Sequence, residues 1–138
     1  MTAARIFLDS NVLLYLQSAD ETKANRAEVI ASAGGVISIQ VLNEITYVMR
    51  RKFNSPWVQI NEVMESLQRL FTIEPVNIDV HLTGRRLAER YGFNFYDATI
   101  VASALLAGCE LLYSEDMHDG LLVEDRLRIS NPFANPGL

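Results

Sequence analysis

The sequence has few of the features that mark secreted, membrane-bound or strongly basic proteins. It contains one cysteine among 138 residues, so no disulfide can form within the chain, and we expect Cys109 to be a buried thiol in a reducing, cytoplasmic compartment. The formal net charge of −5 argues against holding nucleic acid by electrostatic attraction alone. No apolar run is long enough for a membrane span or a signal peptide, so we expect neither.

Repeats, low-complexity segments and linkers rich in Pro, Gly or Ser are also missing. With 49% hydrophobic and 21% charged residues over 138 positions, the chain has the balance of a globular protein with its own hydrophobic core. We therefore predict a single domain over residues 1–138.

What the chain does contain is an alternation of short apolar segments with longer amphipathic ones. This pattern predicts an α/β fold with a short, mainly parallel sheet flanked by helices. Functional groups in such sheets gather beyond the carboxyl ends of the strands. Strands are predicted at 5–8, 36–38, 72–76, 111–113 and 127–129, and helices at 12–16 (capped by Ser10 or Asn11), 23–33, 40–53, 57–71, 77–91 and 97–107.

Four acidic residues occupy unusual places in this pattern. Asp9 and Asp116 each follow a predicted strand, and Asp97 opens a helix that is otherwise apolar or small on every side. Glu44 lies at the margin of the apolar face of its helix, where a charged side chain is rarely buried unless it is paired. All four acids are candidates for one site.

Each acid also has an ordinary structural explanation. Asp97 can cap its helix, Glu44 can reach solvent or pair with Arg51, and Asp116 can form a turn. Gathered in one pocket, however, four carboxylates would repel and raise one another's pKa unless cations neutralised them. Mg²⁺ and Mn²⁺ prefer oxygen ligands, so the set predicts a divalent-cation site.

The segments around these acids are recognisable in their order. They are "FLDSNVLLY" with Asp9, "VLNEITYV" with Glu44, "FYDATIVASA" with Asp97 and "LLYSEDMHDG" with Asp116. Over essentially its whole length the chain resembles PIN-domain ribonucleases, in particular the VapC-type toxins of VapBC toxin–antitoxin pairs. The resemblance implies a PIN-like three-layer fold.

The fourth segment offers several acids. A Ser or Thr two places before an Asp in the family matches Ser114 and Asp116, so the resemblance assigns Asp116 rather than Asp119 to the site. If strand alternation continues, Glu115 points away from it. The stretch "ISNPF" at 129–133 is similar to a frequent ending of the family.

The resemblance implies a metal-dependent endoribonuclease that leaves a 5′ phosphate. On this hypothesis Asp9, Asp97 and Asp116, assisted by Glu44, hold one or two Mg²⁺ or Mn²⁺ ions against a phosphate of the RNA substrate. Ser114 would hydrogen-bond a carboxylate or a metal-bound water. The resemblance also implies a small antitoxin partner and homodimerisation through helices.

Other interpretations stay open. A non-catalytic RNA- or protein-binding PIN-like module is the main rival, although all four acids are present, and an RNA-maturation nuclease would carry the same acids. A haloacid-dehalogenase phosphatase needs an Asp where Asn11 stands. The basic clusters at 49–53 and 84–90 are expected to be solvated helix faces. Trp57 is expected in the core, with base stacking as the alternative.

Overall fold

The computed structural model describes residues 4–134, in which six strands form one sheet. The strand order is β3-β2-β1-β4-β6-β5, and every neighbouring pair is parallel except β5 with β6. The prediction of a mainly parallel α/β sheet is confirmed. The strands are β1 (Ile6–Leu8), β2 (Val36–Ser38), β3 (Thr72–Glu74), β4 (Leu111–Tyr113), β5 (Leu122–Val123) and β6 (Leu127–Ser130).

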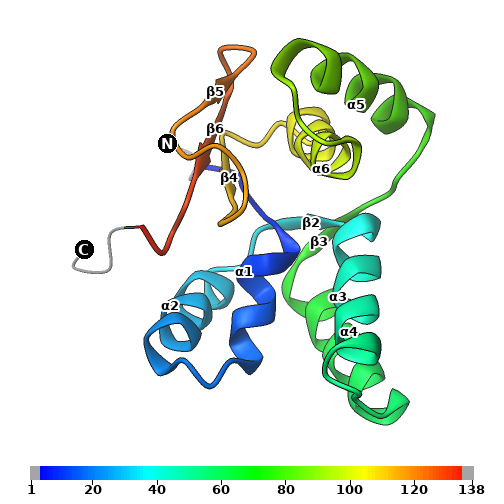
Figure 1. Cartoon of the computed structure of the whole chain (residues 1–138), viewed down its shortest axis with the longest axis vertical. Coiled ribbons are helices and arrows are strands. Elements are labelled where there is room, and N and C mark those ends of the chain that lie inside the picture. The colour runs from blue at the N-terminus through cyan, green and yellow to red at the C-terminus, as the bar shows by residue number, and fades with distance from the viewer. Residues whose placement is uncertain (1–3, 135–138) are drawn as a thin grey trace.

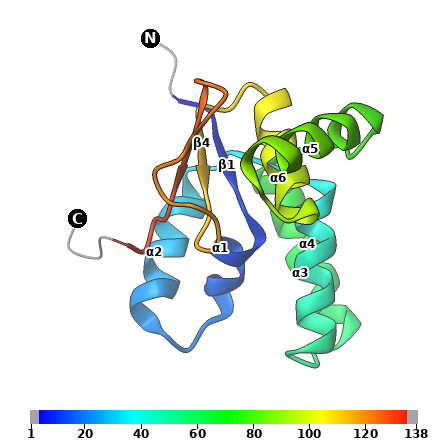
Figure 2. The same cartoon turned by 45° about the horizontal axis from the view of Figure 1, so that its top comes forward.

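The helices lie around the sheet in three pairs (Figure 1). In the view of Figure 2, α1 lies between α2 and α3, directly after β1. The helices are α1 (Ser10–Leu14), α2 (Glu21–Ser32), α3 (Ile39–Arg51), α4 (Trp57–Leu70), α5 (Ile78–Tyr91) and α6 (Phe95–Leu106), with a 3₁₀ turn η1 (Tyr15–Gln17). No helix within residues 4–134 is both long and apolar enough to cross a membrane.

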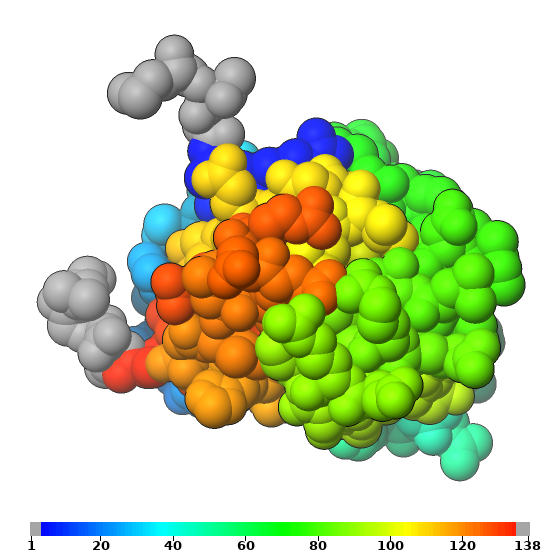
Figure 3. All heavy atoms as spheres, turned by 90° about the horizontal axis from the view of Figure 1, so that it is seen from above, coloured from blue at the N-terminus to red at the C-terminus, as the bar shows by residue number. Residues whose placement is uncertain are grey.

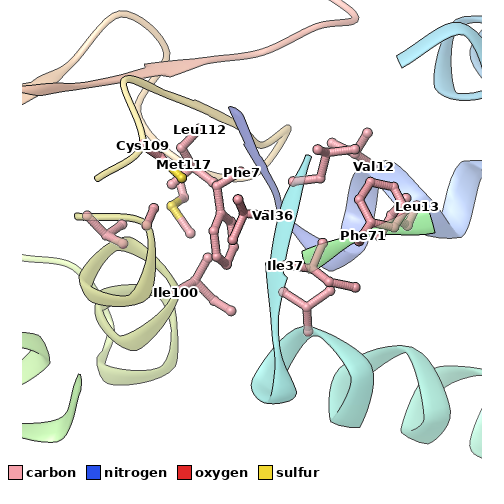
Figure 4. Close-up of a cluster of buried hydrophobic side chains, with 14 of the residues drawn as sticks. Phe7, Val12, Leu13, Val36, Ile37, Phe71, Ile100, Cys109, Leu112 and Met117 are labelled. Atoms are coloured by element: carbon pink, nitrogen blue, oxygen red, sulfur yellow. The ribbon is translucent and has the colours of Figure 1, made fainter. Parts of the chain in front are cut away.

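The hydrophobic core occupies both faces of the sheet, because successive residues of a strand point to opposite sides. Figure 4 shows Phe7 of β1 directed toward Ile100 of α6, whereas Ile37 of β2 lies on the other side of the strand with Leu13 and Phe71. All five side chains are buried. Burial on both faces explains why the strand sequences read as continuous apolar runs.

Helix α6 is buried along almost its whole length, as its composition predicts. Residues 98–105 are all buried, and α5 packs closely against them. The contact is close because Gly84 of α5 has no side chain; a Cβ there would lie 3.3 Å from Cγ2 of Thr99. This packing fixes the amino-terminal end of α6, where Asp97 stands.

Some predicted boundaries are wrong. The N-cap of α1 is Asp9, not Ser10 or Asn11, because its carboxylate accepts the Ser10 N–H. Helix α6 begins two residues before Asp97, because Asn94 is its N-cap. Strand β3 ends before Pro75, which has no N–H to donate to a ladder.

One strand, β5, was not predicted at all. It is two residues long and pairs antiparallel with β6 at the edge of the sheet. The turn between them holds Glu124 and Asp125 with positive φ values of 51° and 58°. So short a strand has no periodicity of its own to detect.

Gly35 allows a close approach between β2 and β1. Its φ is +137°, and a Cβ would stand 2.7 Å from the carbonyl oxygen of Ile6, a backbone atom that cannot move aside. Gly108 also has a positive φ, of +73°, but open space around it.

We expect Gly35→Ala to lower the free energy of unfolding by about 2–4 kcal/mol, because strain and a backbone clash add together. Gly108→Ala should lower the free energy of unfolding by only about 1 kcal/mol, since a side chain there adds backbone strain but no clash. Urea unfolding of both variants measures the difference, and equal losses would contradict the proposed clash.

Candidate active site

The centre of the candidate site is formed where β1 and β4 end side by side. Leu8 is in register with Tyr113, so the next residues along the two strands, Asp9 and Ser114, are neighbours. The Ser114 hydroxyl donates to Asp9 Oδ2 at 2.8 Å. Both residues are buried, Asp9 with 4% exposure. The predicted hydrogen bond from Ser114 to a carboxylate is present.

Glu44 reaches this centre from α3. The Ser10 hydroxyl donates to Glu44 Oε1 at 2.7 Å, and the Gln40 amide donates to Oε2 at 3.1 Å. The backbone N–H of Ser10 donates to Asp9 Oδ1 at 2.7 Å. Ser10 therefore links the two carboxylates, and Glu44 has this role in place of a pair with Arg51.

Asp97 lies in the first turn of α6, but it does not cap the helix. Asn94 accepts the Asp97 N–H at 2.9 Å and donates its own amide to Asp97 Oδ2 at 2.8 Å. Burial raises the pKa of the Asp97 carboxyl, and the negative charges of Glu44 and Asp116 raise it further. Because Asn94 caps the helix, helix capping does not explain the carboxylate of Asp97.

Asp116 is exposed in the loop after β4, and Asn11 connects it to the buried centre. The Asn11 amide lies 3.2 Å from Asp116 Oδ2 and 3.3 Å from Asp9 Oδ2. Its carbonyl oxygen accepts the Glu115 N–H at 3.1 Å. Sequence reasoning missed this role; the available signal was an amide two residues after Asp9, at the same edge of the sheet.

The other acids of this loop are engaged elsewhere. Glu115 points away from the site, as predicted, and accepts hydrogen bonds from Lys23 (2.8 Å) and Tyr15. Burial raises the pKa of the Glu115 carboxyl, but these hydrogen bonds outweigh burial and hold it below its usual value. Asp119 accepts the backbone N–H of Asn131 at 2.8 Å. Asp116 is thus the acid of the loop whose carboxylate contacts Asn11.

Asp9 carries the strongest electrostatic perturbation of the site. Burial raises the pKa of its carboxyl from 3.8 to about 7, against the hydrogen bonds from Ser114 and Ser10, and the charges of Glu44 and Asp97 add to the increase. Within residues 4–134, no Lys or Arg forms an ion pair with Asp9. A buried carboxylate with only neutral donors is costly to ionise.

The chemistry of these residues fits a hard divalent cation, which would neutralise the clustered carboxylates. All four acids offer oxygen donors, the type that Mg²⁺ and Mn²⁺ prefer. In the described part of the chain, no three His, Cys, Asp or Glu side chains stand close enough together to hold an ion as they are placed. The fit therefore rests on donor type and on the buried charge of Asp9.

The remaining candidate residues have structural roles or lie at the surface. In Figure 3 the surface of α5 adjoins that of the β5–β6 hairpin, where Arg86 and Arg90 pair with Glu124 at 2.6 and 2.7 Å. The 84–90 cluster is a solvated helix face, as predicted. Cys109 is buried, also as predicted, and burial raises its pKa. Trp57 is 53% exposed, so its expected place in the core is wrong.

The raised pKa of Asp9 predicts a pH-dependent stability. Without divalent ions, the folded protein keeps a proton on Asp9 up to about pH 7, whereas the unfolded chain releases it near 3.8. The free energy of unfolding should therefore fall as the pH rises from about 4 to about 7. Urea unfolding in EDTA measures this slope.

Two variants test whether Asp9 causes this pH dependence of stability. Asp9→Asn removes the titrating group and should flatten the decline. Asp125→Asn is the matched control, because Asp125 is exposed in a turn with φ of 58°, a conformation that Asn adopts readily. An Asp9→Asn slope equal to that of the parent would contradict the assignment.

Comparison with known proteins agrees with the observed fold. Residues 6–118 match the model of the PIN domain family. The comparison with curated proteins gave no match.

Solved structures share the fold over most of the chain. A toxin–antitoxin complex from Klebsiella pneumoniae is 20% identical with a TM-score of 0.71, over 93% of this chain and 98% of that one. FitAcB from Neisseria gonorrhoeae is 19% identical with a TM-score of 0.68, over 94% of this chain and 99% of that one. VapC20 of Mycobacterium tuberculosis is described as a toxin that cleaves the sarcin–ricin loop. It is 18% identical with a TM-score of 0.65, over 80% of this chain and 89% of that one. By its family match and its fold, this chain belongs to the PIN domain family.

Proposed function

We propose that this protein is a metal-dependent endoribonuclease, the toxin of a type II toxin–antitoxin pair. The observation that carries the proposal is Asp9, a buried carboxylate at the carboxyl end of the central strands that has no cationic partner among residues 4–134. The negative charges of Glu44 and Asp97 raise the pKa of Asp9, and that of Asp116 raises the pKa of Asp97. Such an arrangement is unfavourable for stability alone and is typical of a site that binds cations.

In the proposed site, Asp9, Asp97 and Asp116, assisted by Glu44, hold one or two Mg²⁺ ions, with Mn²⁺ as a substitute. When bound, the ions supply polarisation of the phosphoryl group, a lowered pKa of water and stabilisation of the leaving oxygen. They also invert the local charge, so that an acidic protein can receive a phosphate.

The neutral residues of the site orient the carboxylates. Ser114 and Asn11 both lie against Asp9 Oδ2, at 2.8 and 3.3 Å, and the Ser10 N–H fixes Oδ1. These contacts leave Asp9 little rotational freedom, and the same Asn11 amide ties the exposed Asp116 to it. Such supporting hydrogen bonds set the position of a metal ligand before the metal arrives.

RNA as substrate and an antitoxin as partner are supported by the family and by the fold neighbours. VapC20 is described as cleaving the sarcin–ricin loop, and further neighbours are VapBC or FitAB complexes with DNA. By analogy we propose a small antitoxin partner, a homodimer formed through helices and a cytoplasmic location for this chain. An RNA-maturation nuclease would use the same site.

A cleavage assay tests the nuclease. Purified protein should cut a mixed RNA pool in Mg²⁺ or Mn²⁺ but not in EDTA. Asp97→Asn keeps the shape of the side chain and removes a charge, so we expect cleavage to fall at least about 100-fold while urea unfolding shows an intact fold. Asp125→Asn should cut like the parent.

Parental cleavage by Asp97→Asn would show that Asp97 has no such role. Absence of cutting by the folded parent with either metal would favour the non-catalytic RNA- or protein-binding module.

Metal binding has a readout that is independent of cleavage. An ion that binds only the folded state raises the thermal midpoint, so Mn²⁺ should raise the midpoint of the parent and of Asp125→Asn. Asp116→Asn should reduce this shift, because Asp116 is an exposed ligand that folding does not require. Equal shifts in Asp116→Asn and the parent would exclude Asp116 as a ligand.

A further inference from the structure

Three neighbouring hollows that share lining residues lie between the acids and the carboxyl-terminal end of α3. The first, of about 900 Å³, is bordered by Glu44, Asp116 and Lys52. The second, of about 530 Å³, shares Asp116 with the first and is bordered by Phe53. The third shares Phe53 and Gln17 with the second. We call these three hollows together the α3 groove.

Lys52 gives this groove a positive charge. Glu44, Val48 and Lys52 are four residues apart and share one face of α3, with Lys52 roughly 12 Å along the helix from Glu44. Among residues 4–134, Lys52 is the only Lys or Arg that borders the groove, and it forms no ion pair there. Its ammonium group is available to an anion that lies beside the acids rather than among them.

Phe53 gives the groove an aromatic surface. The side chain is 49% exposed, and the amide side chains of Gln17, Asn54 and Gln59 border the same hollow. An exposed ring among amides suits a nucleobase, whose face stacks on the ring while its edge hydrogen-bonds.

Trp57 is less suited to this role. The Arg50 guanidinium lies over its ring, 5.3 Å from the ring centroid, so one face is already covered. Trp57 also does not border any of the three hollows.

We propose that the α3 groove binds single-stranded RNA next to the scissile phosphate, with Lys52 contacting a flanking phosphate and Phe53 stacking on an unpaired base. The proposal rests on the proposed nuclease function, because it takes the acids as the place of cleavage. Single-stranded RNA is the occupant that fits, since a base held in a duplex cannot present its face to Phe53.

Binding is measured in the cleavage-deficient Asp97→Asn protein with Mg²⁺, by fluorescence anisotropy of a fluorescein-labelled, mixed-sequence single-stranded RNA. Adding Lys52→Gln to this protein should weaken RNA binding. It should also reduce the slope of log affinity against log salt concentration by about 0.7, the value for one lost phosphate contact on a single strand. Added Phe53→Leu should weaken binding about five- to 150-fold with no change of slope, the range for loss of base stacking.

Two neighbouring residues supply matched controls. Arg51→Gln removes the same charge one position away, from a residue that does not border the groove, and Trp57→Leu removes an exposed aromatic ring. Both should bind like the Asp97→Asn parent. Urea midpoints close to that of the parent show that each variant is folded.

The outcomes separate this proposal from the nuclease itself. Unchanged affinity and salt slope in Lys52→Gln and Phe53→Leu, while the wild-type chain cuts RNA, would overturn the groove and leave the nuclease intact. Equal binding of a duplex of the same sequence, with the same losses, would overturn the single-stranded occupant. Loss of binding in only these two variants, with no cutting by the wild-type chain, would support an RNA groove and overturn the nuclease.

Discussion

The burial of one carboxylate, Asp9, is the constraint around which the site is organised. The parallel register of β1 with β4 brings Asp9 beside Ser114, and the start of α1 supplies donors from Ser10 and Asn11. All of these donors are neutral. They fix the position of the carboxylate without neutralising its charge, so ionisation of Asp9 in this buried position costs free energy. That cost is reasonable only if a cation or a proton offsets it.

Exposure of the acids increases from the strand end outward, which gives the site a direction. Asp9 is buried, Glu44 and Asp97 are partly exposed, and Asp116 is exposed in its loop. The inner acid is held by the rigid sheet, whereas the outer one is tied to it through Asn11. A phosphate would therefore approach from the side of Asp116, where the α3 groove begins.

The proposed action of an acidic protein on RNA needs positive charge at the place of contact, and four basic side chains of residues 4–134 are already held in ion pairs. Arg86 and Arg90 join α5 to the β5–β6 hairpin through Glu124. Lys23 holds Glu115 beside the site. Bound cations at the acids and the unpaired Lys52 in the groove would confine attraction for phosphate to the proposed place of cleavage.

The sequence by itself determined the α/β class, most of the helices and the four candidate acids, because periodicity and charged residues in apolar surroundings are local signals. It could not determine strand order, which depends on pairing between segments distant in the chain. The two-residue β5 is too short to show a periodicity, and Ser10 and Asn11 fit the cap of α1 as well as Asp9 does. The bridging contacts of Asn11 and the groove between Lys52 and Phe53 also came only from the tertiary structure. Both form where β1, α1, α3 and the loop after β4 meet, and no spacing within one segment specifies how separate segments meet.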